Sequence, residues 1–155
     1  MKDMMEDMMQ QGTCLSLDRF EFYDMWLLLS LGIGKRGSNL KEILSSGDML
    51  NHAVFTLDEL NYGMSKLIYN GFVKQENERY SPTNKAKNFL MKNEKEDEGC
   101  IEKLLRLAPI FESEHAEQGC KLTGYFSQKE CDEAYGSGWL IMLFHKLAKL
   151  FHRNP

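Results

Sequence analysis

The sequence predicts a mainly helical protein with one small β-hairpin, and three observations support this fold class. Apolar residues recur at helical spacing through most of the chain, and several helix starts carry a cap residue followed three positions later by Glu. A short apolar segment near residue 72 is separated by a polar turn from a second one near residue 80, which is typical of a hairpin. With 155 residues and 43% hydrophobic composition, the chain is long enough to bury its own core.

Two helices are expected in the first fifty residues. The first spans residues 18–33, where Asp18 and Glu21 have the spacing of a capping box and apolar residues follow on one face. A glycine-rich basic turn comes next. A shorter helix is then expected over residues 38–46, followed by a connector.

The third helix, expected over residues 56–71, has the clearest pattern in the first half of the chain. Thr56 and Glu59 form a capping box, and one apolar stripe follows them. Gly71 is expected to end the helix, because glycine readily takes the left-handed conformation found at helix ends.

A hairpin and a fourth helix complete the first half. Residues 72–75 and 79–81 are expected to pair as strands around a polar turn at residues 76–78. Pro82 is expected to end the pairing because proline has no N–H to donate. A helix over residues 83–92 should follow directly.

The rest of the chain is expected to add helices only. The acidic stretch 94–98 indicates a solvated helix end or linker. A helical pattern over residues 100–107 should stop at Pro109, and residues 110–126 are expected to form a loop. Ser127 then opens a further capping box, and the helix expected after it is apolar on more than one face.

The order helix, helix, helix, hairpin, helix resembles the winged-helix (winged helix-turn-helix) family. Leu67–Val73 is similar to the end of that family's third helix with its first wing strand, and Arg79–Ala86 is similar to the close of its wing. Pro82 stands where an aliphatic residue is usual, and Ala86 where glycine is usual. The resemblance covers residues 15–93, about half of the chain.

The resemblance divides the chain into three parts. Residues 1–13 are expected to be a flexible leader, residues 14–93 the winged-helix domain, and residues 94–155 a helical extension. The last helix, Trp139–Phe151, is expected to pack on the first helix or to form a dimer interface. The resemblance implies a homodimer, since many winged-helix regulators pair through terminal helices.

The resemblance implies a small DNA-binding transcriptional regulator. In that family the third helix enters the major groove of double-stranded DNA and the wing contacts the backbone. The alternative is a winged-helix protein-protein interaction module without a role in DNA binding, because fold alone does not decide between them. The residues expected to face DNA are Asn61, Tyr62, Ser65, Lys66, Tyr69, Lys74, Arg79 and Lys85.

The charge distribution permits DNA binding without arguing for it. The net charge is −4, of which residues 1–13 carry −2, residues 14–93 carry +1 and residues 94–155 carry −3. A protein that binds nucleic acid through bulk positive charge is therefore not expected. The third helix has no arginine, and Asp58 and Glu59 in its first turn would repel phosphate.

The sequence predicts no metal, no cofactor and no enzyme activity. Its four cysteines include no pair at the close spacing of zinc ligands. The glycines of residues 32–37 match G-x-G-x-x-G, but a helix rather than a strand is expected before them, which does not fit a nucleotide site. An enzyme would depend on one polar loop with acid–base candidates, namely Glu112, Glu114, His115 and Glu117.

Hydropathy predicts a cytoplasmic protein. The longest apolar stretches, Met25–Leu29 and Trp139–Phe144, are far shorter than the roughly 20 residues that a bilayer span requires. The first ten residues contain three acids and no apolar core, unlike a secretory signal.

Overall fold

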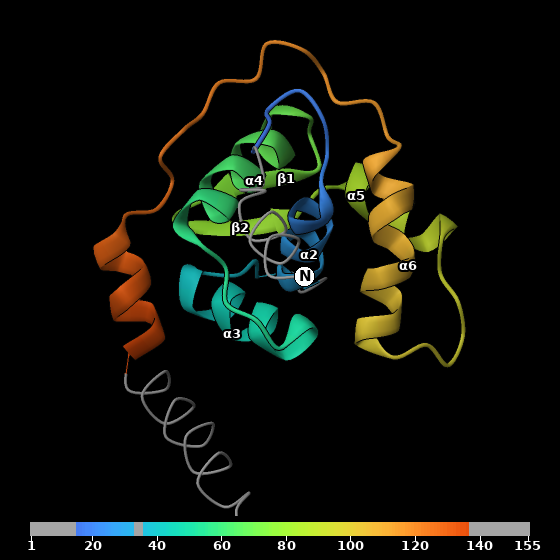
Figure 1. Cartoon of the computed structure of the whole chain (residues 1–155), viewed down its shortest axis with the longest axis horizontal. Coiled ribbons are helices and arrows are strands. Elements are labelled where there is room, and N and C mark those ends of the chain that lie inside the picture. The colour runs from blue at the N-terminus through green and yellow to red at the C-terminus, as the bar shows by residue number, and fades with distance from the viewer. Residues whose placement is uncertain (1–14, 33–35, 137–155) are drawn as a thin grey trace, which may run out of the picture.

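The computed structural model describes residues 15–32 and 36–136, and it is mainly helical with one two-stranded antiparallel hairpin, as predicted (Figure 1). The arrangement is compatible with a winged-helix shape. The predicted leader and the helix Trp139–Phe151 lie outside the described residues, and residues 128–136 are helical. The elements are α2 (Phe22–Ser30), α3 (Leu40–Asn51), α4 (Leu57–Tyr69), β1 (Val73–Glu76), β2 (Arg79–Pro82), α5 (Asn84–Lys92) and α6 (Cys100–Glu112).

Helix α2 lies at the centre and contacts α3, α4 and α6 (Figure 1). Seven of its nine residues are buried, so it is covered around most of its circumference rather than along one stripe. Its capping box joins Glu21 to Asp24, and the predicted box at Asp18 is wrong by about one turn. The helix starts later because the preceding chain turns Phe20 into the core, where the side chain is 2% exposed.

An aromatic stack and a hydrogen bond hold α3 and the chain that follows it against α2. The Trp26 ring lies 3.7 Å from that of Phe55, and its Nε1 donates a hydrogen bond of 2.8 Å to the carbonyl oxygen of Gly47. A Cβ at Gly47 would overlap the Phe55 ring, so this close approach requires glycine. The predicted end of the second helix at residue 46 is wrong, because Gly47 is buried in this contact and the helix continues to Asn51.

The hairpin has a two-residue turn. Val73 pairs with Pro82 and Glu76 pairs with Arg79, so Pro82 takes part in the ladder that it was expected to end. Asn77 and Glu78 have φ angles of 49° and 60°, the left-handed backbone that tight hairpins need at both central positions. Beyond the hairpin, the backbones of Ser38 and Tyr80 pair and cover the other edge of β2.

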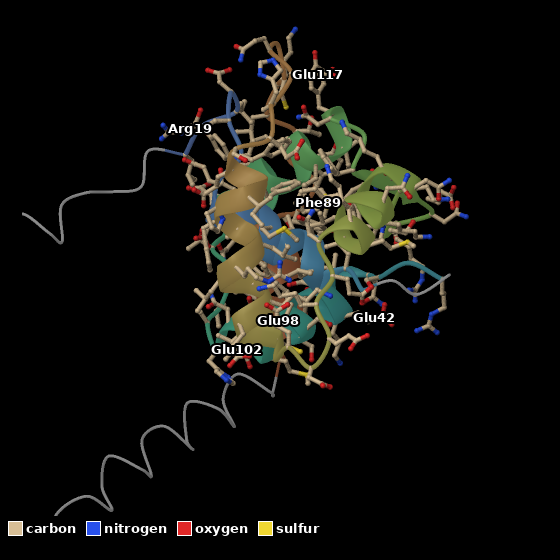
Figure 2. The ribbon with its side chains drawn as sticks, turned by 90° about the vertical axis from the view of Figure 1, so that its right-hand side faces the viewer. Arg19, Glu42, Phe89, Glu98, Glu102 and Glu117 are labelled. Carbon is tan, nitrogen blue, oxygen red and sulfur yellow. The ribbon has the colours of Figure 1, made fainter. Side chains whose placement is uncertain are left out.

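Helix α6 belongs to the same core as the helices before the hairpin. The ring of Phe111 lies 4.5 Å from Phe20, 5.0 Å from Phe72 and 5.2 Å from Phe89. The predicted stop at Pro109 is wrong: the helix runs through Pro109 to Glu112. Pro109 lies on the exposed side above Leu105, where water can bond the carbonyl that its missing N–H leaves free. Figure 2 shows α6 on the side facing the viewer, with Glu98 and Glu102 near its start and Glu117 beyond its end.

Candidate functional site on helix α4

The outward face of α4 is covered by another part of the chain. Residues 113–127, called here the connecting segment, run from the end of α6 to the helical residues 128–136 and pass over α4 (Figure 1). Residues 110–126 were predicted to be a loop, and residues 114–127 contain no helix or strand. What the sequence did not predict is where this segment lies.

Two polar side chains of α4 each bind the backbone of one residue in the connecting segment. Asn61 Nδ2 donates to the carbonyl oxygen of Phe126 at 3.0 Å, and Asn61 Oδ1 accepts the Phe126 N–H at 2.9 Å. The Ser65 hydroxyl accepts the Thr123 N–H at 2.9 Å and donates to the Thr123 carbonyl oxygen at 3.3 Å. Both backbone groups of Thr123 and of Phe126 are therefore satisfied by side chains of α4.

The same arrangement continues at the end of α4. Tyr69 Oη donates to the carbonyl oxygen of Gln118 at 3.1 Å, and Asn70 Oδ1 accepts the N–H of Glu117 at 2.7 Å. Gly119 makes the turn between these contacts and the next, with a φ of 92° that disfavours any side chain. A Cβ there would also lie only 3.3 Å from the Tyr69 hydroxyl.

Asn61, Ser65 and Tyr69, called here the α4 polar row, lie four residues apart and so share one face of the helix. Every partner atom of the row in the connecting segment is a main-chain atom. Two side chains anchor the segment at its ends: Ala116 is 3% exposed and Phe126 is 8% exposed. The row therefore binds main-chain atoms of the connecting segment, and the two anchors add side-chain packing.

Lys66 was predicted to face DNA, and this orientation is wrong. Its side chain is completely buried between α4 and α2, where Nζ lies 2.6 Å from Asp24 Oδ2 and 2.8 Å from Tyr23 Oη. Nζ also donates to the carbonyl oxygen of Arg19 at 3.0 Å. The missing side chain at Gly63 gives α2 and its carboxylate room to approach, since a Cβ there would lie 3.2 Å from Asp24 Oδ1.

Burial also changes the titration of this ion pair. Loss of solvent raises the pKa of Asp24 to about 7, against the opposing effect of the Lys66 ammonium and the N–H of Glu21. Burial and the Asp24 carboxylate raise the pKa of the Tyr23 hydroxyl as well. Glu21 lies at the edge of the cluster, with Oε2 3.7 Å from Lys66 Nζ.

The substitution Asp24→Asn should therefore flatten the pH dependence of stability near neutrality. The native pKa of Asp24 lies above its unfolded value, so the folded state holds this proton more tightly. The free energy of unfolding should fall as the pH rises from about 4 to about 7 and then level off. Urea unfolding across this range should show the fall in the wild type and a smaller one in the variant. An equal slope in both proteins would contradict the assignment.

Three other carboxyl groups have lowered pKa values and titrate at lower pH than Asp24. They therefore do not obscure the comparison between the wild type and Asp24→Asn. Arg106 lowers the pKa of Glu98 through a short ion pair, and hydrogen bonds to the Asn39 backbone and to Ser127 lower the pKa values of Glu42 and Glu130. A carboxyl whose pKa is lowered loses its stabilising effect only as the pH falls through its native value.

The other predicted cations each have a partner within the protein. Lys74 pairs with Glu76 at 2.8 Å on the exposed hairpin. Arg79 Nη1 donates to Glu42 at 2.9 Å and also to the carbonyl oxygen of Gly37 at 2.7 Å. Lys85 donates to the carbonyl oxygen of Asn70 at 2.8 Å, and its Nζ lies 4.4 Å from the centre of the Phe72 ring.

The predicted DNA-facing set is therefore divided in the structure. The α4 polar row gathers under the connecting segment, Tyr62 packs at the edge of the core, and Lys66 is buried behind the helix. Lys74, Arg79 and Lys85 lie on the hairpin and on α5. Sequence reasoning missed the contact between the connecting segment and α4, because the segment contributes main-chain atoms, which leave no residue pattern.

Comparison with known proteins found no matching family model, no similar curated protein and no similar solved structure. Within residues 15–32 and 36–136, no cluster of three metal-ligating side chains occurs, and none of the helices there is long and apolar enough to cross a bilayer. The polar residues weighed as acid–base candidates are all exposed, namely Glu112, Glu114, His115 and Glu117.

Proposed function

We propose that this protein is a winged-helix interaction module in which α4 binds polypeptide instead of entering a DNA groove. The observation that carries this proposal is the set of reciprocal hydrogen bonds from Asn61 and Ser65 to the backbone of the connecting segment. The Asn61 side chain, which could read adenine in a groove, uses both its amide nitrogen and its amide oxygen here to bind the carbonyl and N–H of Phe126.

The distribution of positive charge supports the same choice. Affinity for DNA depends mainly on Lys and Arg side chains that meet phosphates. In this protein Lys66 is buried against Asp24, and Arg79 is engaged with Glu42 and Gly37. The α4 polar row contains no cation, and the acidic Asp58 lies in the first turn of the same helix. This surface is better suited to a neutral backbone than to phosphate.

A DNA-binding assay tests the proposal directly. Full-length protein at about 10 µM should give no saturable change in the fluorescence anisotropy of a random-sequence duplex at about 50 mM salt, conditions under which nonspecific DNA-binding proteins bind readily. Exchanging Lys74 for Glu should leave this result unchanged. Saturable binding that weakens steeply with salt, and that the exchange abolishes, would restore the DNA-binding regulator instead.

A further inference from the structure

We propose that the α4 polar row is a docking site for an extended segment of a partner protein, with the connecting segment as its intramolecular competitor. This inference rests on the proposed function and names the partner's chemistry. The partner would present consecutive main-chain N–H and carbonyl groups to Asn61 and Ser65, as Phe126 and Thr123 do now.

The chemistry of the row explains why another segment can fit. Main-chain groups are common to all polypeptides, so the hydrogen bonds of Asn61 and Ser65 set a path and a register without requiring one sequence. Selectivity comes from the two anchors. The Phe126 ring packs edge-to-face on Tyr80 with 5.3 Å between centroids, and Ala116 fills a small buried space. A partner should carry an aromatic residue where Phe126 lies and a small one where Ala116 lies.

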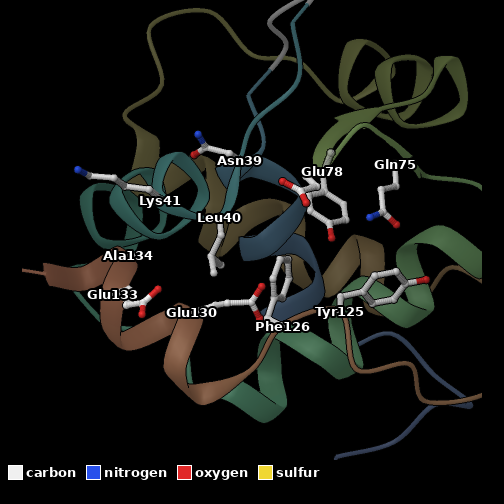
Figure 3. A pocket seen from close by; sticks show the side chains of 11 residues that line it. Asn39, Leu40, Lys41, Gln75, Glu78, Tyr125, Phe126, Glu130, Glu133 and Ala134 are labelled. Carbon is white, nitrogen blue, oxygen red and sulfur yellow. The ribbon is translucent and has the colours of Figure 1, made fainter.

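The connecting segment leaves space that a partner can fill. Beside Phe126 lies an open cavity of about 550 Å³ between the hairpin, the start of α3 and the chain after the segment. Figure 3 shows Tyr125 and Phe126 on one side of it, with Leu40 on α3 and Gln75 and Glu78 on the hairpin. A partner whose side chains enter this cavity gains contacts that the connecting segment does not make.

These additional contacts matter because the connecting segment is part of the same chain and is always close to α4. A tethered segment competes at an effective concentration in the millimolar range, so a partner must bind the bare face more tightly than the segment does. The segment is itself loosely covered: Glu114, His115, Glu117 and Gln118 are all exposed. Besides the two anchors, Tyr125 packs on Tyr80, and the rest of the segment is held mainly by the hydrogen bonds of its main chain to α4 and Asn70.

Proline substitution in the full-length protein provides the test. Thr123→Pro removes the N–H that Ser65 accepts and leaves α4 unchanged. Lys121→Pro is the matched control, because among the described residues the Lys121 N–H donates no hydrogen bond. The probe is a fluorescent synthetic peptide of residues 113–127, with serine in place of its cysteine, and its binding is followed by anisotropy.

The peptide should bind Thr123→Pro about tenfold more tightly than it binds the wild type or Lys121→Pro, since loss of one hydrogen bond weakens the competitor by about that factor. A peptide with alanine in place of Phe126 should bind Thr123→Pro about tenfold less tightly than the original peptide, because only the probe and not the tethered competitor then loses its aromatic anchor. Adding Asp58→Asn to Thr123→Pro, on the same helix away from the row, should not change the affinity for the original peptide.

Glu117→Pro provides a second route if Thr123→Pro does not fold, because it removes the N–H that Asn70 accepts at the other end of the segment. Glu117→Pro should show the same gain in affinity for the peptide. Equal peptide binding by all variants, or none by either loosened variant, would overturn the inference. So would a gain in duplex binding without a gain in peptide binding. The proposed function fails separately, if the wild type itself binds duplex DNA.

Discussion

At a pH above about 7, where the Asp24 carboxyl of the wild type is ionised, replacing Lys66 with Met should destabilise the protein by about 3–5 kcal/mol, because it leaves this carboxyl buried without its counter-charge. The side chain of Lys66 is completely buried, and so is that of Asp24, 2.6 Å away. Adding Asp24→Asn to the Lys66→Met protein should recover part of this loss, since the carboxylate is then removed while an oxygen remains to accept the N–H of Glu21. Urea unfolding of the two variants measures both effects.

Lys92→Met is the matched control, since Lys92 is exposed at the end of α5. It should change the free energy of unfolding by less than about 0.5 kcal/mol. A loss of similar size in Lys92→Met and Lys66→Met would contradict the importance of the buried pair. If the double variant were no more stable than Lys66→Met alone, the buried carboxylate would not be the source of the loss.

Replacing Phe126 with Ala should release the connecting segment while the helical core stays folded. The side chain is 8% exposed, so its loss should cost the segment about 3 kcal/mol, the lower end for a buried aromatic residue. Because the segment lies at the surface of the core, this cost should appear as local opening. Amide hydrogen exchange should quicken at Thr123 and at residue 126, and exchange in α2 should change little.

Leu122→Ala is the control within the same segment, because Leu122 is 49% exposed and packs on little. Its amide exchange should match the wild type. Equal acceleration of exchange in α2 and in the connecting segment of Phe126→Ala would mean that the segment and the core unfold together. The face of α4 could not then be uncovered in a folded protein, and the docking proposal would lose its physical basis.

Much of the fold was predictable because it depends on local patterns. The capping box of Thr56 and Glu59 forms as predicted, and so does that of Ser127 and Glu130. Left-handed backbone at Asn77 and Glu78 closes the predicted hairpin without glycine. These features depend on residues close together in the sequence, so the chain encodes them directly.

The errors arose where distant contacts overrule local preference. Proline predicts a helix end at Pro109 from the local sequence alone. The helix continues because Phe111 packs on Phe20 and Phe72 in the core, and the local sequence does not show this contact. A lysine on a helix is normally expected to face solvent. Lys66 can be buried because it pairs with the carboxylate of Asp24 on α2. The α4 polar row was predicted to lie on an open face of the helix, whereas the structure places it beneath the connecting segment, where Ser65 is 3% exposed.

The aromatic cluster around Phe111 bears on how the chain folds. Phe20 and Phe111 lie 4.5 Å apart in space but about 90 residues apart in sequence, so their contact closes a long loop and costs entropy before it stabilises anything. During synthesis α2 leaves the ribosome well before α6, the helix that covers one of its sides. The most apolar of the described helices is therefore incompletely covered until α6 has been made. The core of the described residues is closed by one of the last of their helices to be synthesised.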